Sequence, residues 1–256
     1  MLLSRVLGLC ILLTGTLAVQ AQQTITMGAG ISMPPYVIAA TDRGIAVDLF
    51  RAAMDQVGIS VNIEYDNNEN IVSAFNEQAL DAIFVANQQL APNAYFSDLP
   101  LVVLHNQAVA LKASDVQLEK IRDLRYYRLG AYRLATKLLP PPYAATSKRA
   151  ISYREYVQQI EQVEDLFRQD QQVLVIDSTI FRYYLSQLRR QSPSSQVYRQ
   201  QYEYFDLFPK SRHFALFHNP DMKNAFDEGF AKIRENGRYE RILRTYQALL
   251  SDYLFR

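Results

Sequence analysis

The 256-residue sequence contains no tryptophan, one cysteine and only nine glycines. So few glycines argue against a glycine-rich phosphate-binding loop, and Gly28 and Gly30 lack the third glycine of a dinucleotide-binding turn. An excess of one charge is also missing, because 27 Lys and Arg residues balance 26 Asp and Glu residues. The formal net charge of +1 creates no strong field for nucleic acid, so we expect no nucleic-acid partner.

Motifs of the common enzyme classes are missing as well. The sequence has no GxSxG, HExxH or P-loop pattern. Its three histidines, His105, His213 and His218, do not have the spacing of metal ligands. We therefore expect no catalytic residues, no metal and no cofactor. Hydrophobic residues make up 49% and charged residues 21%, which is ordinary for a globular protein.

The N-terminal segment has the three regions of a secretory signal peptide. Arg5 precedes an apolar run over residues 6–13, and a stretch of small residues ends at Ala21. The run is too short to span a bilayer comfortably, so we expect cleavage after Ala21 and a periplasmic mature chain. The alternative is an uncleaved anchor helix. Cleavage would remove Cys10, leaving a chain without disulfides that its hydrophobic core must stabilise.

A strand–helix alternation begins after residue 22 and occurs twice. In the first unit we expect strands at 24–31, 61–65 and 80–86, with helices capped by Asp48 and at 70–79. In the second we expect strands at 126–132, 149–153 and 172–176, a helix carrying Tyr156 to Phe167, and one capped by Ser178. Two successive β-α-β-α-β units predict an α/β fold with two parallel-sheet lobes.

Two strand-like passages connect these units. Residues 101–111 lead from the first unit to the second, and residues 197–217 lead back. Asn219-Pro220 then begins a helical C-terminal segment. We therefore predict a signal peptide at 1–21, a discontinuous lobe I of residues 22–104 plus 211–256, and a lobe II of residues 105–210. Such lobes can close on a ligand by a hinge motion.

Several stretches carry a family resemblance. They are MPPYVIAATDRGIAVDLFRAAMDQVG (33–58), the Leu80-Asp81 strand entry, YFSDLPLVV (95–103), RDLRYYRLGAY (122–132), VLVIDSTIFRYYL (173–185) and DMKNAFDEGFAKIRENGRYERILRTYQ (221–247). In order and spacing the chain resembles a divergent family 3 extracellular solute-binding protein. The resemblance implies two Rossmann-like lobes joined by two crossover strands, as in type II periplasmic binding proteins, with the ligand in the cleft between them.

The sequence departs from this family's amino-acid site. The family's amino-acid binders carry an Arg that clamps the ligand carboxylate, whereas residues 81–100 contain no Arg or Lys. The family's Gly-Thr or Gly-Ser pair is replaced by Tyr132-Arg133, and its Gly before the Asp81-type strand is replaced by Gln78. The resemblance therefore implies the fold but not an intact amino-acid site.

Candidate ligand-binding residues follow from the sheet geometry, because ligands of open α/β sheets lie beyond the carboxyl ends of the strands. Those ends carry Tyr36, Asn87, Gln88, Tyr132, Arg133 and Asp177. Tyr36 offers a ring and one hydroxyl, or packs on its own lobe. Arg133 suits a carboxylate, or is simply solvent-exposed. Asp177 can take a ligand amine, as the family's matching Asp does, or cap the next helix.

We therefore expect a monomeric periplasmic protein that captures a small polar solute, amino-acid-like or a related organic acid, for an ABC permease or a membrane sensor. One alternative is a dehydratase-like enzyme on the same fold, which would need an acid and a base facing the cleft. Another is a degenerate interaction module without a small ligand. A cleft filled by Tyr36 and Tyr132 would favour that module, and an open polar cleft would favour binding.

We predict that the exported protein begins at Gln22. Intact-mass measurement of the exported chain should give the mass of residues 22–256. A chain that retains Met1, or that carries lipid on Cys10, would contradict the predicted cleavage.

Overall fold

The computed structural model describes residues 23–31, 33–85 and 91–251. The expected signal peptide and its cleavage site at Ala21 lie outside the described residues. Within those three ranges, no helix is both long and apolar enough to cross a membrane.

The first lobe is built on a mixed sheet. Its strands are β1 (Thr24–Gly30), β2 (Ser60–Asp66), β3 (Ala82–Val85), β4 (Tyr95–Phe96), β5 (Val102–Leu104) and β11 (Ser211–Phe217). The strand order is β2-β1-β3-β11-β4, and β5 pairs with β11. β1 runs parallel to β2 and β3, because helices α1 (Ile45–Asp55) and α2 (Asn68–Asn76) form the crossover connections.

The second lobe repeats this arrangement. Its strands are β6 (Asn106–Leu111), β7 (Arg128–Tyr132), β8 (Ser152–Tyr156), β9 (Val173–Asp177) and β10 (Tyr202–Phe205), in the order β10-β6-β9-β7-β8. Its helices are α3 (Ala135–Leu138), α4 (Pro141–Ser147), α5 (Gln159–Phe167) and α6 (Ser178–Gln191). Short 3-10 helices lie at Ala39–Thr41, Lys112–Ser114, Ile121–Tyr126 and Val197–Arg199. The predicted α/β fold of two lobes, each with a parallel β-α-β-α-β unit, is confirmed.

Some local predictions were wrong. The strand expected at 149–153 begins three residues later, so Tyr156 ends β8 rather than lying in α5. Asp48 does not cap α1, because the helix begins at Ile45 after Gly44. Ser178 does not cap α6 either, because it is the first helical residue and Asp177 is the N-cap. The passage 101–111 is not one strand but splits at His105 into β5 and β6, which belong to different sheets.

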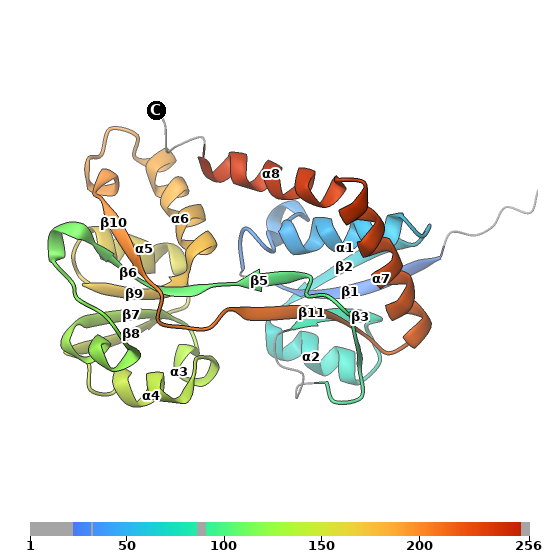
Figure 1. Cartoon of the computed structure of the whole chain (residues 1–256), viewed down its shortest axis with the longest axis horizontal. Coiled ribbons are helices and arrows are strands. Elements are labelled where there is room, and N and C mark those ends of the chain that lie inside the picture. Colours follow the sequence, from blue (N-terminus) through green and yellow to red (C-terminus); the bar gives the residue numbers. More distant parts are fainter. Residues whose placement is uncertain (1–22, 32, 86–90, 252–256) are drawn as a thin grey trace, which may run out of the picture.

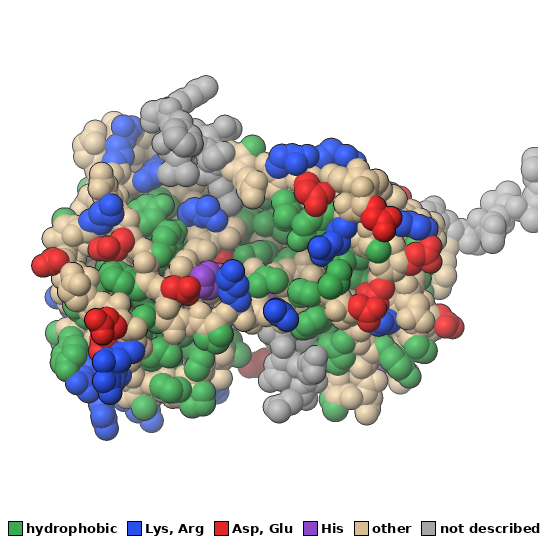
Figure 2. All heavy atoms as spheres, in the orientation of Figure 1, with side chains coloured by type: hydrophobic (Ala, Val, Ile, Leu, Met, Phe, Trp, Pro, Cys, Tyr) green, Lys and Arg blue, Asp and Glu red, His purple; other side chains and the backbone are tan. Residues whose placement is uncertain are grey.

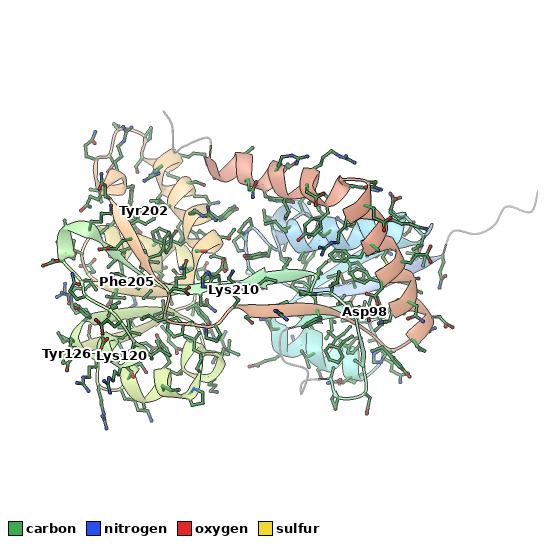
Figure 3. All side chains as sticks on the ribbon, viewed as in Figure 1. Asp98, Lys120, Tyr126, Tyr202, Phe205 and Lys210 are labelled. Atoms are coloured by element: carbon green, nitrogen blue, oxygen red, sulfur yellow. The ribbon has the colours of Figure 1, made fainter. Side chains whose placement is uncertain are left out.

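Two crossovers join the lobes side by side, as Figure 1 shows. β5 and β11 pair antiparallel along this passage. The His105 Nε2 atom lies 2.7 Å from an Asp206 carboxylate oxygen, which ties the first crossover to the second. Lys210 lies on the second crossover, between β10 and β11 (Figure 3). The exact lobe boundaries, after residues 104 and 210, stay a prediction.

The C-terminal helices α7 (Pro220–Glu235) and α8 (Arg238–Ser251) both pack against α1 of the first lobe. α8 continues past the first lobe and also contacts α6 of the second (Figure 1). Its Tyr246 hydroxyl accepts a hydrogen bond from the Gly44 backbone and donates one to Asp48. The C-terminal segment therefore connects the lobes on one side of the molecule.

The buried core also connects the lobes on one side of the molecule only. One apolar cluster runs without a break from α1 and α7 of the first lobe to α5 and α6 of the second. Two smaller clusters are separate, one beside α2 and one beside α3 and α4. The lobes are thus packed together on the α1, α6 and α8 side and have separate cores on the α2 and α3 side.

We predict that Gly229→Ala destabilises the protein, because α1 and α7 cross most closely there. A β-carbon on Gly229 would lie 2.0 Å from the Ala53 carbonyl oxygen. Overpacking of this kind typically costs about 1–3 kcal/mol, which exceeds the helix preference of Ala over Gly, about 1 kcal/mol. Urea unfolding followed by circular dichroism measures the change.

The matched control is Asn224→Ala at an exposed position of the same helix, and its expected effect is within about 0.5 kcal/mol. An unchanged free energy of unfolding for Gly229→Ala would show that α1 and α7 are not in close contact.

Candidate functional site

The loop that carries Tyr36 is held tightly to the start of α1. The Pro35 and Tyr36 carbonyls accept hydrogen bonds from the backbone N–H groups of Ile45 and Ala46. Gly44 makes this approach possible: its φ is 142°, and a β-carbon there would lie 2.3 Å from the Tyr36 carbonyl oxygen. The Tyr36 ring is therefore presented from a fixed backbone.

Asp177 ends β9 and caps α6. One carboxylate oxygen accepts hydrogen bonds from the backbone N–H groups of Thr179 at 2.9 Å and Ile180 at 3.0 Å. The other accepts one from the His105 backbone at 2.7 Å. The capping role that the sequence allowed for Asp177 is therefore present, and the same carboxylate also holds the first crossover.

Tyr36 and Asp177 meet across the two lobes. The Tyr36 hydroxyl lies 3.3 Å from one Asp177 oxygen and 3.5 Å from the other. Both distances exceed the usual hydroxyl–oxygen distance of about 2.7 Å, so this is a weak, shared hydrogen bond. The side chains are only 5% and 2% exposed. Burial raises the pKa of both groups, and the Asp177 charge raises the pKa of Tyr36 further.

Tyr132 lies close to the same carboxylate. It ends β7, which stands between β9 and β8 in the sheet. Burial raises the pKa of its hydroxyl, and the charges of Asp177 and Glu155 add to the rise. The carboxyl ends of three neighbouring strands therefore bring Tyr132 between two carboxylates.

Glu155 holds the turn that follows β7. Its oxygens accept hydrogen bonds from the backbone N–H groups of Leu134 at 2.8 Å and Thr136 at 3.2 Å. They also accept bonds from the hydroxyls of Thr136 at 3.1 Å and Tyr153 at 2.8 Å. Burial alone would raise the pKa of Glu155, but these hydrogen bonds outweigh burial and lower it. The backbone donors of this turn are thus occupied by a carboxylate of the chain itself.

Arg133 is exposed at this edge, and its backbone donates to the Tyr156 carbonyl at 3.0 Å. Its guanidinium has no hydrogen bond or ion pair with any residue that the structure describes.

Sequence reasoning missed Arg182, whose positive charge acts against the rise in pKa of both Tyr36 and Tyr204. The sequence could have indicated Arg182 as a site residue by its place on the predicted helix, one turn beyond the Asp177 cap.

The other predicted site residues have different outcomes. Asn87 and Gln88 lie outside the described residues. The structure brings Tyr36 and Tyr132 to Asp177, whereas binding of a ligand carboxylate by Arg133 stays a prediction. No group of three or more His, Cys, Asp or Glu side chains that could hold a metal occurs in the described part of the chain.

Figure 2 shows the molecule hollowed between the lobes at its lower edge, which is the side of α2 and α3 in Figure 1. At Asp177 itself, the Tyr36 ring fills the space where the lobes meet. The site is thus closed around a contact that the chain makes with itself.

Comparisons with known proteins agree with this architecture. A family model described as bacterial extracellular solute-binding proteins, family 3, matches residues 25–248. The comparison with curated proteins found no match.

Solved structures with the same fold have low sequence identity to this chain. A histidine kinase sensor domain similar to periplasmic binding proteins is 17% identical, with a TM-score of 0.67 over 88% of this chain and 96% of that one. The GluR0 ligand-binding core in complex with L-glutamate is 14% identical, with a TM-score of 0.67 over 88% and 99%. An ancestral amino-acid-binding protein, a precursor of cyclohexadienyl dehydratase, is 14% identical, with a TM-score of 0.65 over 87% and 95%.

We predict that Glu155→Gln destabilises the protein at pH 7 and much less below about pH 4. A carboxylate whose pKa is lowered on folding contributes stability above its unfolded pKa, and that stability is lost as the pH falls through the folded value. Urea unfolding across this pH range is the measurement.

Glu119→Gln, at an exposed position in the same lobe, serves as the control and should show no such pH-dependent difference. If Glu155→Gln matched the wild-type protein at every pH, the hydrogen bonds of Glu155 to the turn after β7 would be wrong.

Proposed function

The chain belongs to the bacterial extracellular solute-binding proteins, family 3, and from this premise we propose that it is a periplasmic protein that binds a small polar solute where its two lobes meet. Lobe I would comprise residues 22–104 and 211–256, and lobe II residues 105–210. Arg133 at the rim of lobe II, and Asn87 and Gln88, are further candidate contacts.

The observation that supports solute binding is the Asp177 carboxylate. It is buried at the meeting point of the lobes, and it has no ion-pair partner among the residues described. Its contact with the other lobe is the long Tyr36 hydrogen bond, which a solute with a better donor can replace. A solute bound there would touch both lobes and favour their closed arrangement.

The solute-loaded protein would act as a monomer that delivers to an ABC permease or reports to a membrane sensor. The sensor role is supported by the similarity in fold to a histidine kinase sensor domain. We propose no enzymatic activity for the chain.

A second candidate function is an interaction module that takes no small solute. The observation in its favour is that the buried Tyr36 side chain fills the region around Asp177. In that case the Tyr36–Asp177 hydrogen bond would permanently fasten the lobes, and the functional surface would lie elsewhere.

A thermal-shift screen with a library of small polar metabolites tests solute binding. A solute at 100 times its dissociation constant should stabilise the native state by about 2.7 kcal/mol. Asp177→Asn should keep the α6 cap through its one amide oxygen, but it loses the acceptor for the His105 N–H group. It should weaken solute affinity by roughly 2–5 kcal/mol, because it removes the buried charge.

Asp170→Asn is the matched control, at an exposed position in the same lobe that should leave the affinity unchanged. A screen in which no solute shifts the unfolding temperature would reject solute binding and favour the interaction module. A solute that binds Asp177→Asn as tightly as wild type would place the site away from Asp177.

A further inference from the structure

The charge of the chain is unevenly divided between its lobes. The whole sequence has a formal net charge of only +1, but residues 105–210 contain 16 Lys and Arg residues against 11 Asp and Glu residues. Part of this surplus lies at one end of the second lobe. Figure 2 shows Lys and Arg side chains gathered at the lower left of that lobe, beside exposed hydrophobic side chains. A local surplus of this kind attracts anions even when the net charge is small.

The strand register explains why these side chains meet. β7 and β8 run parallel with Arg128 opposite Ser152, so the chain enters both strands at the same edge of the sheet. The 3-10 helix at Ile121–Tyr126 comes directly before β7, and it packs against α4, which ends shortly before β8. The amino ends of the two strands therefore bring residues 120–128 and 148–151 to one surface, which we call the amino-end face.

Cations outnumber carboxylates on the amino-end face. Its Lys and Arg residues are Lys120, Arg122, Arg125, Arg128, Lys148 and Arg149. Three of them, Arg122, Lys148 and Arg149, are exposed and have no ion pair with any residue that the structure describes. The acidic residues on this face or beside it are Asp115, Glu119, Asp123 and Asp170. The face therefore keeps a surplus of positive charge that the chain itself does not neutralise.

Exposed apolar side chains lie among these cations. Tyr126 is 57% exposed and Ile151 is 67% exposed. The Arg125 guanidinium stacks on the Tyr126 ring, with its central carbon 4.6 Å from the ring centroid. Figure 3 labels Tyr126 and Lys120 at this outer end of the second lobe. A tyrosine ring and an aliphatic side chain between cations match the boundary between lipid headgroups and acyl chains.

We propose that the amino-end face binds the surface of an anionic lipid bilayer, with its cations at the phosphate groups and with Tyr126 and Ile151 among the headgroups. Charge complementarity supports this partner, because Arg and Lys bind phosphates and each cation near an anionic bilayer adds to the attraction. The face lies at the amino ends of β7 and β8, whereas Tyr132 and Asp177 end their strands at the opposite edge of the sheet. Attachment there would leave the proposed solute site clear of the bilayer.

Sedimentation of the exported protein with lipid vesicles tests the proposal. At low ionic strength the protein should bind vesicles of equal parts phosphatidylglycerol and phosphatidylcholine, and it should bind vesicles of phosphatidylcholine alone far more weakly. No preference for the anionic vesicles would overturn the proposal.

A pair of double variants locates the binding surface. Arg122→Gln with Arg149→Gln removes two cations of the amino-end face and should weaken binding to the anionic vesicles by roughly tenfold or more. The matched control is Arg241→Gln with Arg244→Gln, which makes the same change in charge at exposed positions of α8 and should alter binding by less than about twofold. Equal losses in the two variants would show that binding follows net charge alone, which would contradict the proposed face.

Ile151→Ser tests the apolar contact, with Val157→Ser as its matched control. The two side chains flank β8 at opposite ends and are 67% and 66% exposed. Ile151→Ser should weaken vesicle binding several-fold, whereas Val157→Ser should leave it unchanged, and circular dichroism checks that each variant is folded. If Ile151→Ser bound the vesicles like wild type, the face would act by charge alone, as it would toward an acidic protein, and the lipid assignment would be overturned.

Discussion

A single buried carboxylate, Asp177, holds together four parts of the structure. It ends a strand, caps α6, anchors the first crossover through the His105 backbone, and accepts the Tyr36 hydroxyl from the other lobe. Three of these hydrogen bonds come from backbone groups that the fold fixes in place, and they are short. The contact with Tyr36 is long and is the one that can be exchanged without disturbing the second lobe.

In the second lobe, the carboxylates of Glu155 and Asp177 accept hydrogen bonds from different sets of donors. Glu155 accepts two hydrogen bonds from backbone N–H groups after β7 and two from the hydroxyls of Thr136 and Tyr153, so these donors are not free for a ligand anion. Asp177 remains a buried negative charge without an ion pair among the described residues. Neither carboxylate has an ion pair among the described residues, but the two differ in burial: Asp177 is 2% exposed, whereas Glu155 is half-buried.

The packing of the lobes limits how the site can open. A continuous apolar cluster and the α8–α6 contact join the lobes on one side, whereas the cores beside α2 and α3 are separate. Separating the lobes on the joined side would expose buried apolar surface, which is unfavourable. Opening is therefore easier on the side where Figure 2 shows the surface hollowed.

The sequence by itself determined the α/β class, the two parallel units and the residues at their strand ends, because periodicity and strand order are local properties. It also identified Asp177 and Tyr36 as site candidates. Only the tertiary structure decided that these two side chains contact each other, because their 141-residue separation is closed by the two crossovers. It likewise decided that Glu155 occupies the turn after β7: the expected strand at 149–153 was placed three residues early, which hid the position of Glu155 at the strand's carboxyl end. Charge pairing across lobes depends on distances that no pattern along the chain contains.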